Sequence, residues 1–421
     1  MASSNPHVAE TASPDAFNEW AREAGFAFEE AAAALDLEPW MVERFRHPGE
    51  ETIAYLPLIR DSGDAVTVPL FQVQHSAIHG ATIGSISLLP DLQLPQCEAI
   101  AMERSWQAAL LGLPLGGASY GLVCDPQELS ERELMRTLSL AGRHLHKAPA
   151  AGSLLFPGRG CRREFAAKLF AEGRSHCQLT VAGTPDCLGG VDIDRAAAEG
   201  IAAIVSSALV QVGKGGPTAR IAIEGFGSLG QAVSQTLAGE GFSLVALSDN
   251  SGAIYRSDGL ILDDVRARFA REQVLFGYDK AEHISRWELS HVRADVLVLT
   301  SGPGAIHTAA GNGGAGRIVV EAEWNAVAPS ATEAMTASGV LVVPWLVAGC
   351  GALLGSYLES RNVGLWSSGK ELPARVRACM TQVSGTVLKY AGERDVAFGS
   401  AARQCAIERA SQCARSCGTE Y

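Results

Sequence analysis

The sequence predicts an α/β protein with more than one domain, one of them built on a doubly wound parallel sheet. Its 421 residues correspond to about two to three domains by the usual length relation. Hydrophobic residues make up 47% and charged residues 19%, which excludes a disordered chain, a coiled coil or a collagen-like repeat. From about residue 186, short apolar strands alternate with helical segments, which is typical of parallel sheets covered by helices.

The first third of the chain lacks that regular alternation and predicts a mixed α/β domain. Residues 15–45 have helical periodicity. Residues 51–61 and 64–75 alternate like paired strands, so we expect a hairpin with its turn at Asp61 to Asp64. Helical patterns follow at 96–112 and 128–146.

The later part of the chain predicts the strands and helices of the parallel sheet. The longest uncharged stretch, 335–358, contains Pro344 and glycines, so we interpret it as buried core and not as a membrane span. We expect helices at 195–212 and 228–241, strands at 219–227, 242–250, 294–300, 317–321 and 339–343, and a helical tail at 370–417.

A glycine-rich turn follows the first of these strands and opens the next helix. Such a turn holds a dinucleotide pyrophosphate: the first glycine permits the tight turn, the second admits the phosphates and the third lets the helix pack on the strand. The alternative is a glycine-rich turn without a ligand. The predicted cofactor-binding residues of the turn are Gly225, Phe226, Gly227, Ser228, Leu229 and Gly230.

An acidic residue ends the next strand, about 20 residues further on, as this type of site requires. Asp249 is placed to accept hydrogen bonds from an adenosine ribose, and we include its neighbour Asn250 in the site. A carboxylate would repel a 2′-phosphate, so NAD is favoured over NADP, although Arg256 lies nearby. The sequence therefore predicts a Rossmann-type domain that binds NAD.

Charge and cysteine usage exclude several classes of partner. The formal charge of −12 argues against nucleic acid and anionic membranes. The first ten residues lack a secretory signal, and no cysteine spacing resembles a zinc site. We expect a cytoplasmic protein with reduced thiols, no metal and a small-molecule ligand.

From about residue 35 to 415 the chain resembles the Glu/Leu/Phe/Val dehydrogenases, NAD(P)-dependent enzymes that interconvert amino acids and 2-oxo acids plus ammonia. The resemblance implies a substrate-side and oligomerisation domain at 1–185, a dinucleotide-binding domain at 186–365, and a helical segment at 366–421 that packs back on the first domain. It also implies an oligomer, most simply a homo-oligomer. The segments that carry it are 71–91, 113–136, 221–230, 245–260 and 340–360.

The positions that carry charge in this family hold other residues here. The family's Lys-Gly-Gly turn reads Ile83-Gly84-Ser85, its next lysine is Gln107, and the lysine of its second glycine turn is Ser119. Its catalytic Pro-Asp pair falls on Pro157-Gly158. One positioned acid or base contributes about 10²- to 10⁴-fold to a rate, so ordinary oxidative deamination is not expected.

Other matched positions bear on the substrate pocket. We assign Ser119, Trp324, Trp345 and Ser356 to it, the two indoles replacing polar family residues. Substitute catalytic groups are His79, Tyr120 and Cys350, each with a structural alternative: a hydrogen-bonded histidine, a ring filling the space of a lost lysine, and a small buried thiol.

Two functions stay open on the sequence alone. One is a nucleotide-binding pseudoenzyme that assembles with, or regulates, an active partner. The other is a divergent NAD-dependent oxidoreductase for a neutral or apolar amino-acid-derived substrate. The catalytic residues themselves are not identified.

Overall fold

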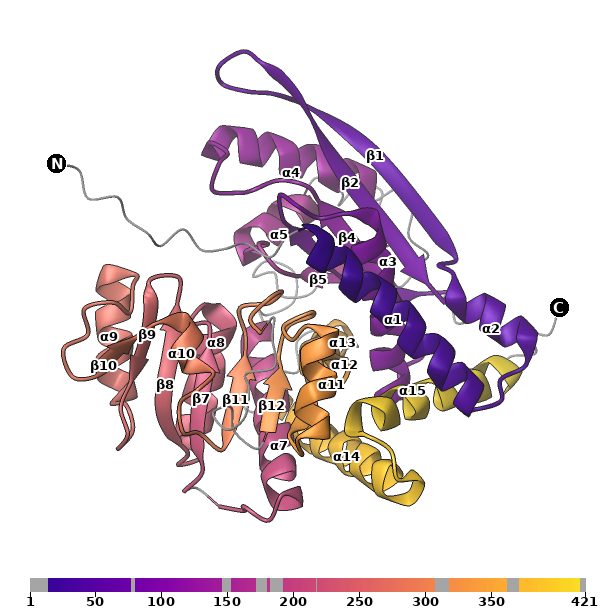
Figure 1. Ribbon diagram of the computed structural model, residues 1–421. Helices are drawn as coiled ribbons and strands as arrows, with labels where there is room; N and C mark the ends of the chain where they lie inside the picture. Colours follow the sequence, from indigo (N-terminus) through magenta and orange to yellow (C-terminus); the bar gives the residue numbers. More distant parts are fainter. Residues whose placement is uncertain are drawn as a thin grey trace. The chain divides into compact units, whose positions relative to one another are not determined.

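A computed structural model of the chain describes residues 14–76, 80–145, 153–171, 180–181, 192–216, 218–306, 318–361 and 371–416 (Figure 1). The chain forms two compact units. Unit 1 comprises Met1–Trp20 and Val205–Trp345, and unit 2 comprises Ala21–Ile204 and Leu346–Tyr421. The division at residues 185 and 365, drawn from the family resemblance, stays a prediction.

Unit 2 is built on a six-stranded mixed sheet in the order β1-β2-β4-β3-β5-β6. The predicted hairpin is confirmed: β1 pairs antiparallel with β2, and the Arg60 amide donates to the Asp64 carbonyl across the turn. The β4, β3, β5 and β6 strands are parallel to one another. The strands are β1 (Glu50–Ile59), β2 (Ala65–His75), β3 (Thr82–Leu88), β4 (Gly116–Leu122), β5 (Leu154–Pro157) and β6 (Thr180–Val181).

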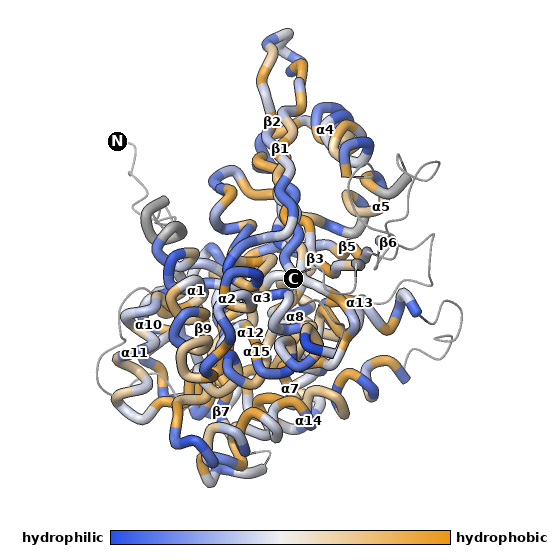
Figure 2. Tube along the Cα trace, turned by 90° about the vertical axis from the view of Figure 1, so that its right-hand side faces the viewer, coloured by the Kyte–Doolittle hydropathy of each residue, from blue (hydrophilic) through white to orange (hydrophobic). Residues whose placement is uncertain are grey.

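Helices from both ends of the chain pack in unit 2. The α4 helix carries hydrophilic and hydrophobic residues along its length (Figure 2), and Leu134, Leu138, Ala141 and Leu145 form its buried face. The C-terminal α15 packs on α3, as the fold prediction requires. The helices are α2 (Pro39–Arg46), α3 (Leu94–Leu110), α4 (Glu131–Leu145), α5 (Arg163–Ala171), α13 (Cys350–Arg361), α14 (Glu371–Arg394) and α15 (Phe398–Ser416).

Unit 1 is built on a seven-stranded sheet in the order β10-β9-β8-β7-β11-β12-β13. The β8, β7, β11, β12 and β13 strands are parallel to one another. Figure 1 shows β8, β7, β11 and β12 side by side. The chain moves from β7 to β8 on one side and later to β11 on the other, so the strand order reverses at β7. The strands are β7 (Arg220–Glu224), β8 (Ser243–Asp249), β9 (Gly252–Tyr255), β10 (Glu282–Ile284), β11 (Val296–Leu299), β12 (Ile318–Glu321) and β13 (Leu341–Val343).

Three of the helices in this part of the chain, α1, α7 and α12, contain residues of both units. The α7 helix crosses from unit 2 into unit 1 at Val205, and α1 crosses the other way after Trp20. The helices are α1 (Pro14–Ala34), α7 (Ile193–Gln211), α8 (Ser228–Gly239), α9 (Leu262–Glu272), α10 (Arg286–Leu289), α11 (Pro329–Ala337) and α12 (Trp345–Ala348).

The single helical segment predicted at 15–45 is wrong in one respect. The structure divides it into α1 and α2, because Asp36 adopts a left-handed φ of 48° and Pro39 begins a new helix. None of the helices in the described ranges is sufficiently long and apolar to span a bilayer. The same ranges contain no group of three or more His, Cys, Asp or Glu side chains arranged to hold a metal ion.

Candidate functional site

The glycine-rich turn lies at the carboxyl end of β7, where the strand order of unit 1 reverses. In parallel α/β sheets, ligands bind at this end of the strands and at this reversal point. The turn connects β7 directly to α8, which begins at Ser228 with Gly227 as its N-cap. The structure therefore gives residues 225–230 the strand, turn and helix context that the sequence predicts.

Two of the three glycines are required by close packing. Gly225 has a φ of 93°, a left-handed conformation that side chains rarely adopt. A Cβ added at Gly230 would lie 1.9 Å from the Gly225 carbonyl oxygen. Thr300 directly follows β11. Its Oγ1 donates to the carbonyl oxygens of Glu224 and Gly225, at 2.9 and 2.8 Å, and these bonds hold the turn against the neighbouring strand.

The middle glycine faces open space. Gly227 has an ordinary φ of −70°, and a Cβ added there would meet no atom within 4 Å. It also provides no side chain to cap the first turn of α8. The N–H groups and the positive end of the helix dipole are therefore available to an anion, as a pyrophosphate site requires.

A buried carboxylate lies beside this turn. Glu224 is 4% exposed, and Arg286 Nη2 on α10 donates to its Oε1 at 2.6 Å. Ser301 Oγ also hydrogen-bonds Glu224 Oε2. The Arg286 guanidinium balances the charge of Glu224, so the buried carboxylate does not leave uncompensated negative charge next to an anion-binding turn.

Asp249 ends β8, the strand next to β7, and its carboxylate holds the following loop. Oδ1 accepts from the amide and the hydroxyl of Ser251, and Oδ2 accepts from the Leu275 amide at 2.7 Å. An ionised carboxylate offers about four acceptor positions, so these three bonds leave room for one ribose hydroxyl. Asn250 is exposed beside it.

The positions expected to carry charge lie in unit 2, and Ile83 is fully buried there. Its side chain belongs to an apolar cluster on β3 with Leu115, Leu154, Phe156 and Leu353. An ammonium group at this position would be buried among apolar side chains unless the cluster rearranged.

Gln107 lies on α3 and is also fully buried. Its Oε1 accepts from Arg104 Nη1, one turn earlier on the helix, at 2.6 Å. The Arg104 guanidinium lies 5.0 Å from the centroid of the Phe156 ring. A buried cation therefore exists one helical turn from Gln107, and sequence reasoning did not single it out.

Ser119 is buried, and Gly158 leaves little room for a side chain. Ser119 is 2% exposed on β4 and its hydroxyl hydrogen-bonds the Cys97 thiol of α3. The Gly158 amide donates to the Ile86 carbonyl. A Cβ at Gly158 would lie 2.9 Å from the Ile86 oxygen and from Ser87 Oγ, so an aspartate would need the backbone to move.

The substitute catalytic groups have different surroundings. Tyr120 is 1% exposed and packs in the apolar cluster shared by β4 and α4. Burial raises the pKa of the Cys350 thiol well above its usual value, so the thiolate is disfavoured. His79 lies outside the described residues.

The two predicted pocket indoles lie in unit 1 and are buried. Trp324 is 3% exposed, and its ring centroid lies 5.2 Å from that of Trp20 on α1. Trp345 is 5% exposed and begins α12, and its amide donates to Glu321 Oε2 at 3.4 Å. In unit 2, Ser356 Oγ donates to the Ala352 carbonyl of its own helix.

Comparison with known proteins supports the fold and the family. The family model described as Glutamate/Leucine/Phenylalanine/Valine dehydrogenase matches residues 189–418, and the model of the Glu/Leu/Phe/Val dehydrogenase dimerisation domain matches 48–151. The chain belongs to the Glu/Leu/Phe/Val dehydrogenase family. Enzymes of this family are NAD(P)-dependent, and the sheet of unit 1 has the Rossmann-type form expected in such proteins.

Several proteins that are similar to this chain are glutamate dehydrogenases. The chain is 30% identical to the glutamate dehydrogenase of Thermotoga maritima over 343 residues, 79% of this chain and 82% of the relative. It is 27% identical over 399 residues to the NAD-specific glutamate dehydrogenase of Staphylococcus aureus, covering 92% and 95% of the two chains. A chain of the hetero-hexameric glutamate dehydrogenase of Thermus thermophilus, in its Leu-bound form, matches with a TM-score of 0.85 and 26% identity over 99% of this chain and 100% of that chain.

Sequence reasoning missed part of the dehydrogenase site in unit 1. Thr300 and Ser301 could have been found, because they directly follow an apolar strand that lies next to β7 in a parallel sheet. Glu224 immediately precedes the glycine turn. No sequence pattern pointed to Arg286, because it lies 62 positions from Glu224 and on a helix, α10, that was not predicted.

Proposed function

We propose that this protein is an NAD(H)-binding, non-catalytic member of the glutamate dehydrogenase group, and that it acts by assembling with an active subunit. The observation that carries the proposal is the set of four uncharged residues in unit 2, at the positions where the family has its lysines and aspartate. They are Ile83, Gln107, Ser119 and Gly158.

The packing around these residues supports the proposal that the catalytic charges have been lost. Ile83 contributes to an apolar cluster, and Gly158 lacks space for a Cβ. The loss of one lysine and one aspartate would raise the barrier by about 3 to 11 kcal/mol on the usual scale of acid–base catalysis. Even the lower figure makes ordinary deamination very slow.

The dinucleotide site supports a retained binding role. Gly227 and the uncapped start of α8 suit a pyrophosphate, and the remaining acceptor position of Asp249 suits a ribose 2′-hydroxyl. A bound nicotinamide cofactor would supply hydride transfer in an active relative. This chain's own residues would hold it: the turn by its amides, and Asp249 by excluding a 2′-phosphate, which favours NAD over NADP.

Assembly with other chains is the remaining part of the proposal. The similar Thermus thermophilus protein is hetero-hexameric, which supports a mixed oligomer for this chain as well. A homo-oligomer is the alternative. Either state is consistent with the dimerisation-domain match at residues 48–151.

The test measures activity and assembly in the same preparations. The protein alone should give no detectable oxidative deamination of glutamate, leucine, phenylalanine or valine with NAD or NADP, and Ser119→Lys should not restore it. Mixed with an active glutamate dehydrogenase of the same cell, it should form a complex of defined mass by light scattering and change that enzyme's rate. Turnover by the protein alone in the usual enzymatic range of about 1 to 10³ per second would contradict the proposal.

A further inference from the structure

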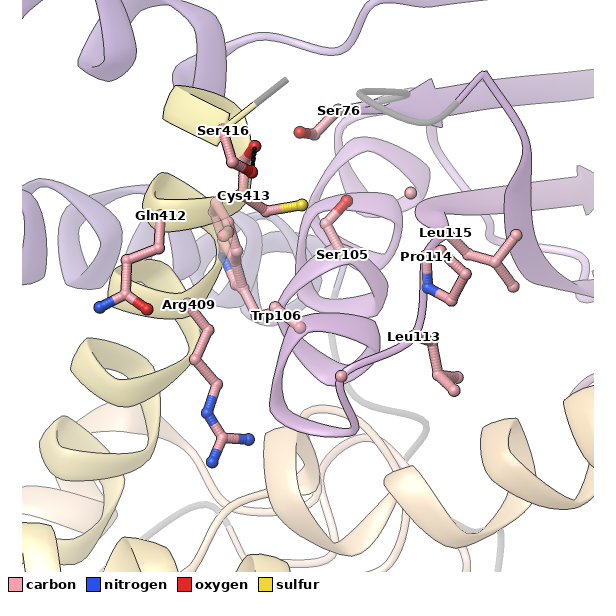
Figure 3. A pocket seen from close by; sticks show the side chains of 14 residues that line it. Ser76, Ser105, Trp106, Leu113, Pro114, Leu115, Arg409, Gln412, Cys413 and Ser416 are labelled. Atoms are coloured by element: carbon pink, nitrogen blue, oxygen red, sulfur yellow. Dashed lines mark hydrogen bonds between the residues drawn. The ribbon is translucent and has the colours of Figure 1, made fainter. Parts of the chain in front are cut away.

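Unit 2 contains a cavity of about 470 Å³ between α3 and the last turns of α15 (Figure 3). Its polar side chains include Ser105, whose hydroxyl is bonded to His75 and to the Gly117 amide. They also include Arg409, which donates to the Leu110 carbonyl at 2.5 Å. These bonds hold the helices and strands of unit 2 together and assign no ligand to the cavity.

In unit 1, a cation lies next to the glycine-rich turn, and the dinucleotide contacts assigned above do not use it. Arg286 is the first residue of α10, and its Nη2 donates to Glu224 Oε1 at 2.6 Å. Glu224 is the last residue of β7 and directly precedes Gly225. The guanidinium therefore lies at the carboxyl end of the sheet, where ligands of parallel α/β sheets bind.

The α10 helix is fixed on the sheet at both of its ends. It begins with a capping box, in which Ser285 Oγ accepts from the Glu288 amide at 3.1 Å and the Glu288 carboxylate accepts from the Ser285 amide at 2.8 Å. At its other end, Leu289 belongs to one apolar cluster with Ala222 of β7 and Ala246 of β8. The helix is thus anchored on the two strands that end in the glycine-rich turn and in the acid proposed to bind the ribose.

Glu224 holds the arginine from the sheet. Side chains two positions apart in a strand point to the same face, so Glu224 lies on the face of Ala222, which α10 covers. Its Oε2 accepts from the hydroxyl of Ser301 and from the Ser301 amide at 3.4 Å. Both carboxylate oxygens are therefore engaged, and the position of the carboxylate next to Arg286 is defined.

Most of the Arg286 guanidinium remains available to a ligand. An arginine has five N–H donors, and within the described part of the chain one of those of Arg286 is in use. The Arg286 side chain is 36% exposed, whereas that of Glu224 is 6% exposed. A planar guanidinium packs favourably on aromatic rings and on nucleobases.

The other proposed contacts place an adenosine near this guanidinium. The pyrophosphate is assigned to residues 225–230 and the ribose to Asp249, at the carboxyl ends of the neighbouring strands β7 and β8. The adenine base is attached to that ribose, so it must lie close to the ends of these two strands. Arg286 lies at the end of β7, on a helix that packs against both strands.

We propose that Arg286 contacts the adenine base of the dinucleotide, with its guanidinium plane against the ring, and that Glu224 is a positioning residue that holds it there. The inference rests on the proposed NAD binding and adds the side chain that selects the base. Arg286 does not select a phosphate, because Glu224 already compensates its charge.

ADP and UDP, titrated by calorimetry into the full-length protein, separate the base from the phosphates that the two nucleotides share. ADP should bind at least about fivefold more tightly than UDP, because a purine offers the guanidinium a larger ring. Arg286→Met should weaken ADP binding at least about fivefold and UDP binding less than about twofold. Equal weakening of both nucleotides would show that Arg286 attracts phosphate and would overturn the assignment.

Further variants test the roles of the plane and of the carboxylate. Arg286→Lys keeps the charge but not the planar group, so it should lose the preference for ADP as Arg286→Met does. Glu224→Gln weakens the ion pair and should reduce that preference in part. The matched control is Arg293→Met, which removes an exposed arginine of unit 1 that precedes β11, at the opposite end of the sheet, and should change neither affinity. A full preference for ADP in Arg286→Lys would contradict the contact with the base.

The same titrations distinguish this inference from the proposed function. Gly227→Ala should weaken ADP and UDP equally, because both carry the pyrophosphate. If the parent bound neither NAD nor ADP, the proposed dinucleotide binding would fail; if it bound both and Arg286→Met changed nothing, this inference alone would fail. If Arg286→Met lost the native circular dichroism spectrum, the double variant Glu224→Gln/Arg286→Met, which leaves no unpaired buried charge, would decide, with the same loss of preference expected.

Discussion

His75 is a buried histidine, and its hydrogen bonds select one tautomer of the neutral imidazole. Its Nε2 lies 2.8 Å from the Phe45 carbonyl, which can only accept, so Nε2 carries the proton. Nδ1 then accepts from Ser105 Oγ at 2.8 Å. Burial lowers the pKa of His75 to about 4, and the bond to Phe45 opposes that shift only in part. The residue therefore acts as a structural link and not as an acid or base near neutral pH.

The depressed pKa of His75 predicts a pH dependence of stability. In the unfolded chain the imidazole takes up a proton below about pH 6.5, while the folded protein does so only near pH 4. Stability is thus complete above pH 6.5 and falls as the pH drops from 6.5 to 4, by about 3 kcal/mol for this group. Urea unfolding at pH 7.5 and pH 4.5 should show a smaller difference for His75→Gln than for the parent. The exposed His47→Gln is the control, and an equal difference in the two variants would refute the prediction.

The glycines of the turn should respond differently to the same substitution. Gly230→Ala places a Cβ 1.9 Å from the Gly225 carbonyl and should displace α8 from β7, lowering the free energy of unfolding. Gly227→Ala meets no atom and should change stability by less than about 1 kcal/mol, while weakening NAD binding about tenfold, or 1.4 kcal/mol. Thermal unfolding and NAD titration measure the two effects. Normal NAD binding by Gly227→Ala would show that the phosphates do not approach this position.

At the scale of secondary-structure elements, α15 is attached to α3 by charged as well as apolar contacts. Arg403 Nη1 pairs with Glu103 Oε1, and both side chains are largely buried. Arg409 donates to the carbonyl that ends α3. Residues 300 positions apart in the sequence are thereby joined, which explains why the C-terminal segment belongs to unit 2.

Removing one partner of this buried pair should be costly. Arg403→Met leaves the Glu103 carboxylate without its cation and should reduce the free energy of unfolding by about 3 to 5 kcal/mol. Glu103→Gln combined with Arg403→Met should recover part of that loss, since no uncompensated charge remains. Chemical denaturation of the two single variants and the double variant measures the coupling. Strictly additive losses would show that the two side chains do not interact.

At the scale of the whole molecule, the two units should respond separately to a dinucleotide. The proposed contacts of the phosphates and the adenosine ribose all lie in unit 1. At a concentration 100 times the dissociation constant, NAD should stabilise the folded protein by about 2.7 kcal/mol. Hydrogen exchange should slow most at residues 224–231 and 249–251. Protection confined to unit 2 would place the binding site elsewhere.

The sequence by itself determined the local features of the fold. The apolar strand before Gly225, the helix after it and the acid at the end of the next strand are adjacent or nearly so in the chain, and the structure places them as predicted. The hairpin of β1 and β2 could also be predicted from the sequence. Alternating apolar and polar residues and a polar turn define it within 26 residues. The replacement of family charges at Ile83, Gln107, Ser119 and Gly158 stays a prediction from the sequence.

Tertiary structure alone decided the features that join distant segments. The pairing of Glu224 with Arg286, the position of Arg104 beside Gln107 and Phe156, and the lack of space at Gly158 depend on which strands and helices become neighbours. The cavity between α3 and α15 belongs to the same group, since its two walls are about 300 residues apart. Local propensity fixes helices, strands and turns, but the burial of a charge or a cavity is a property of packing between elements, and no single segment of the chain contains that information.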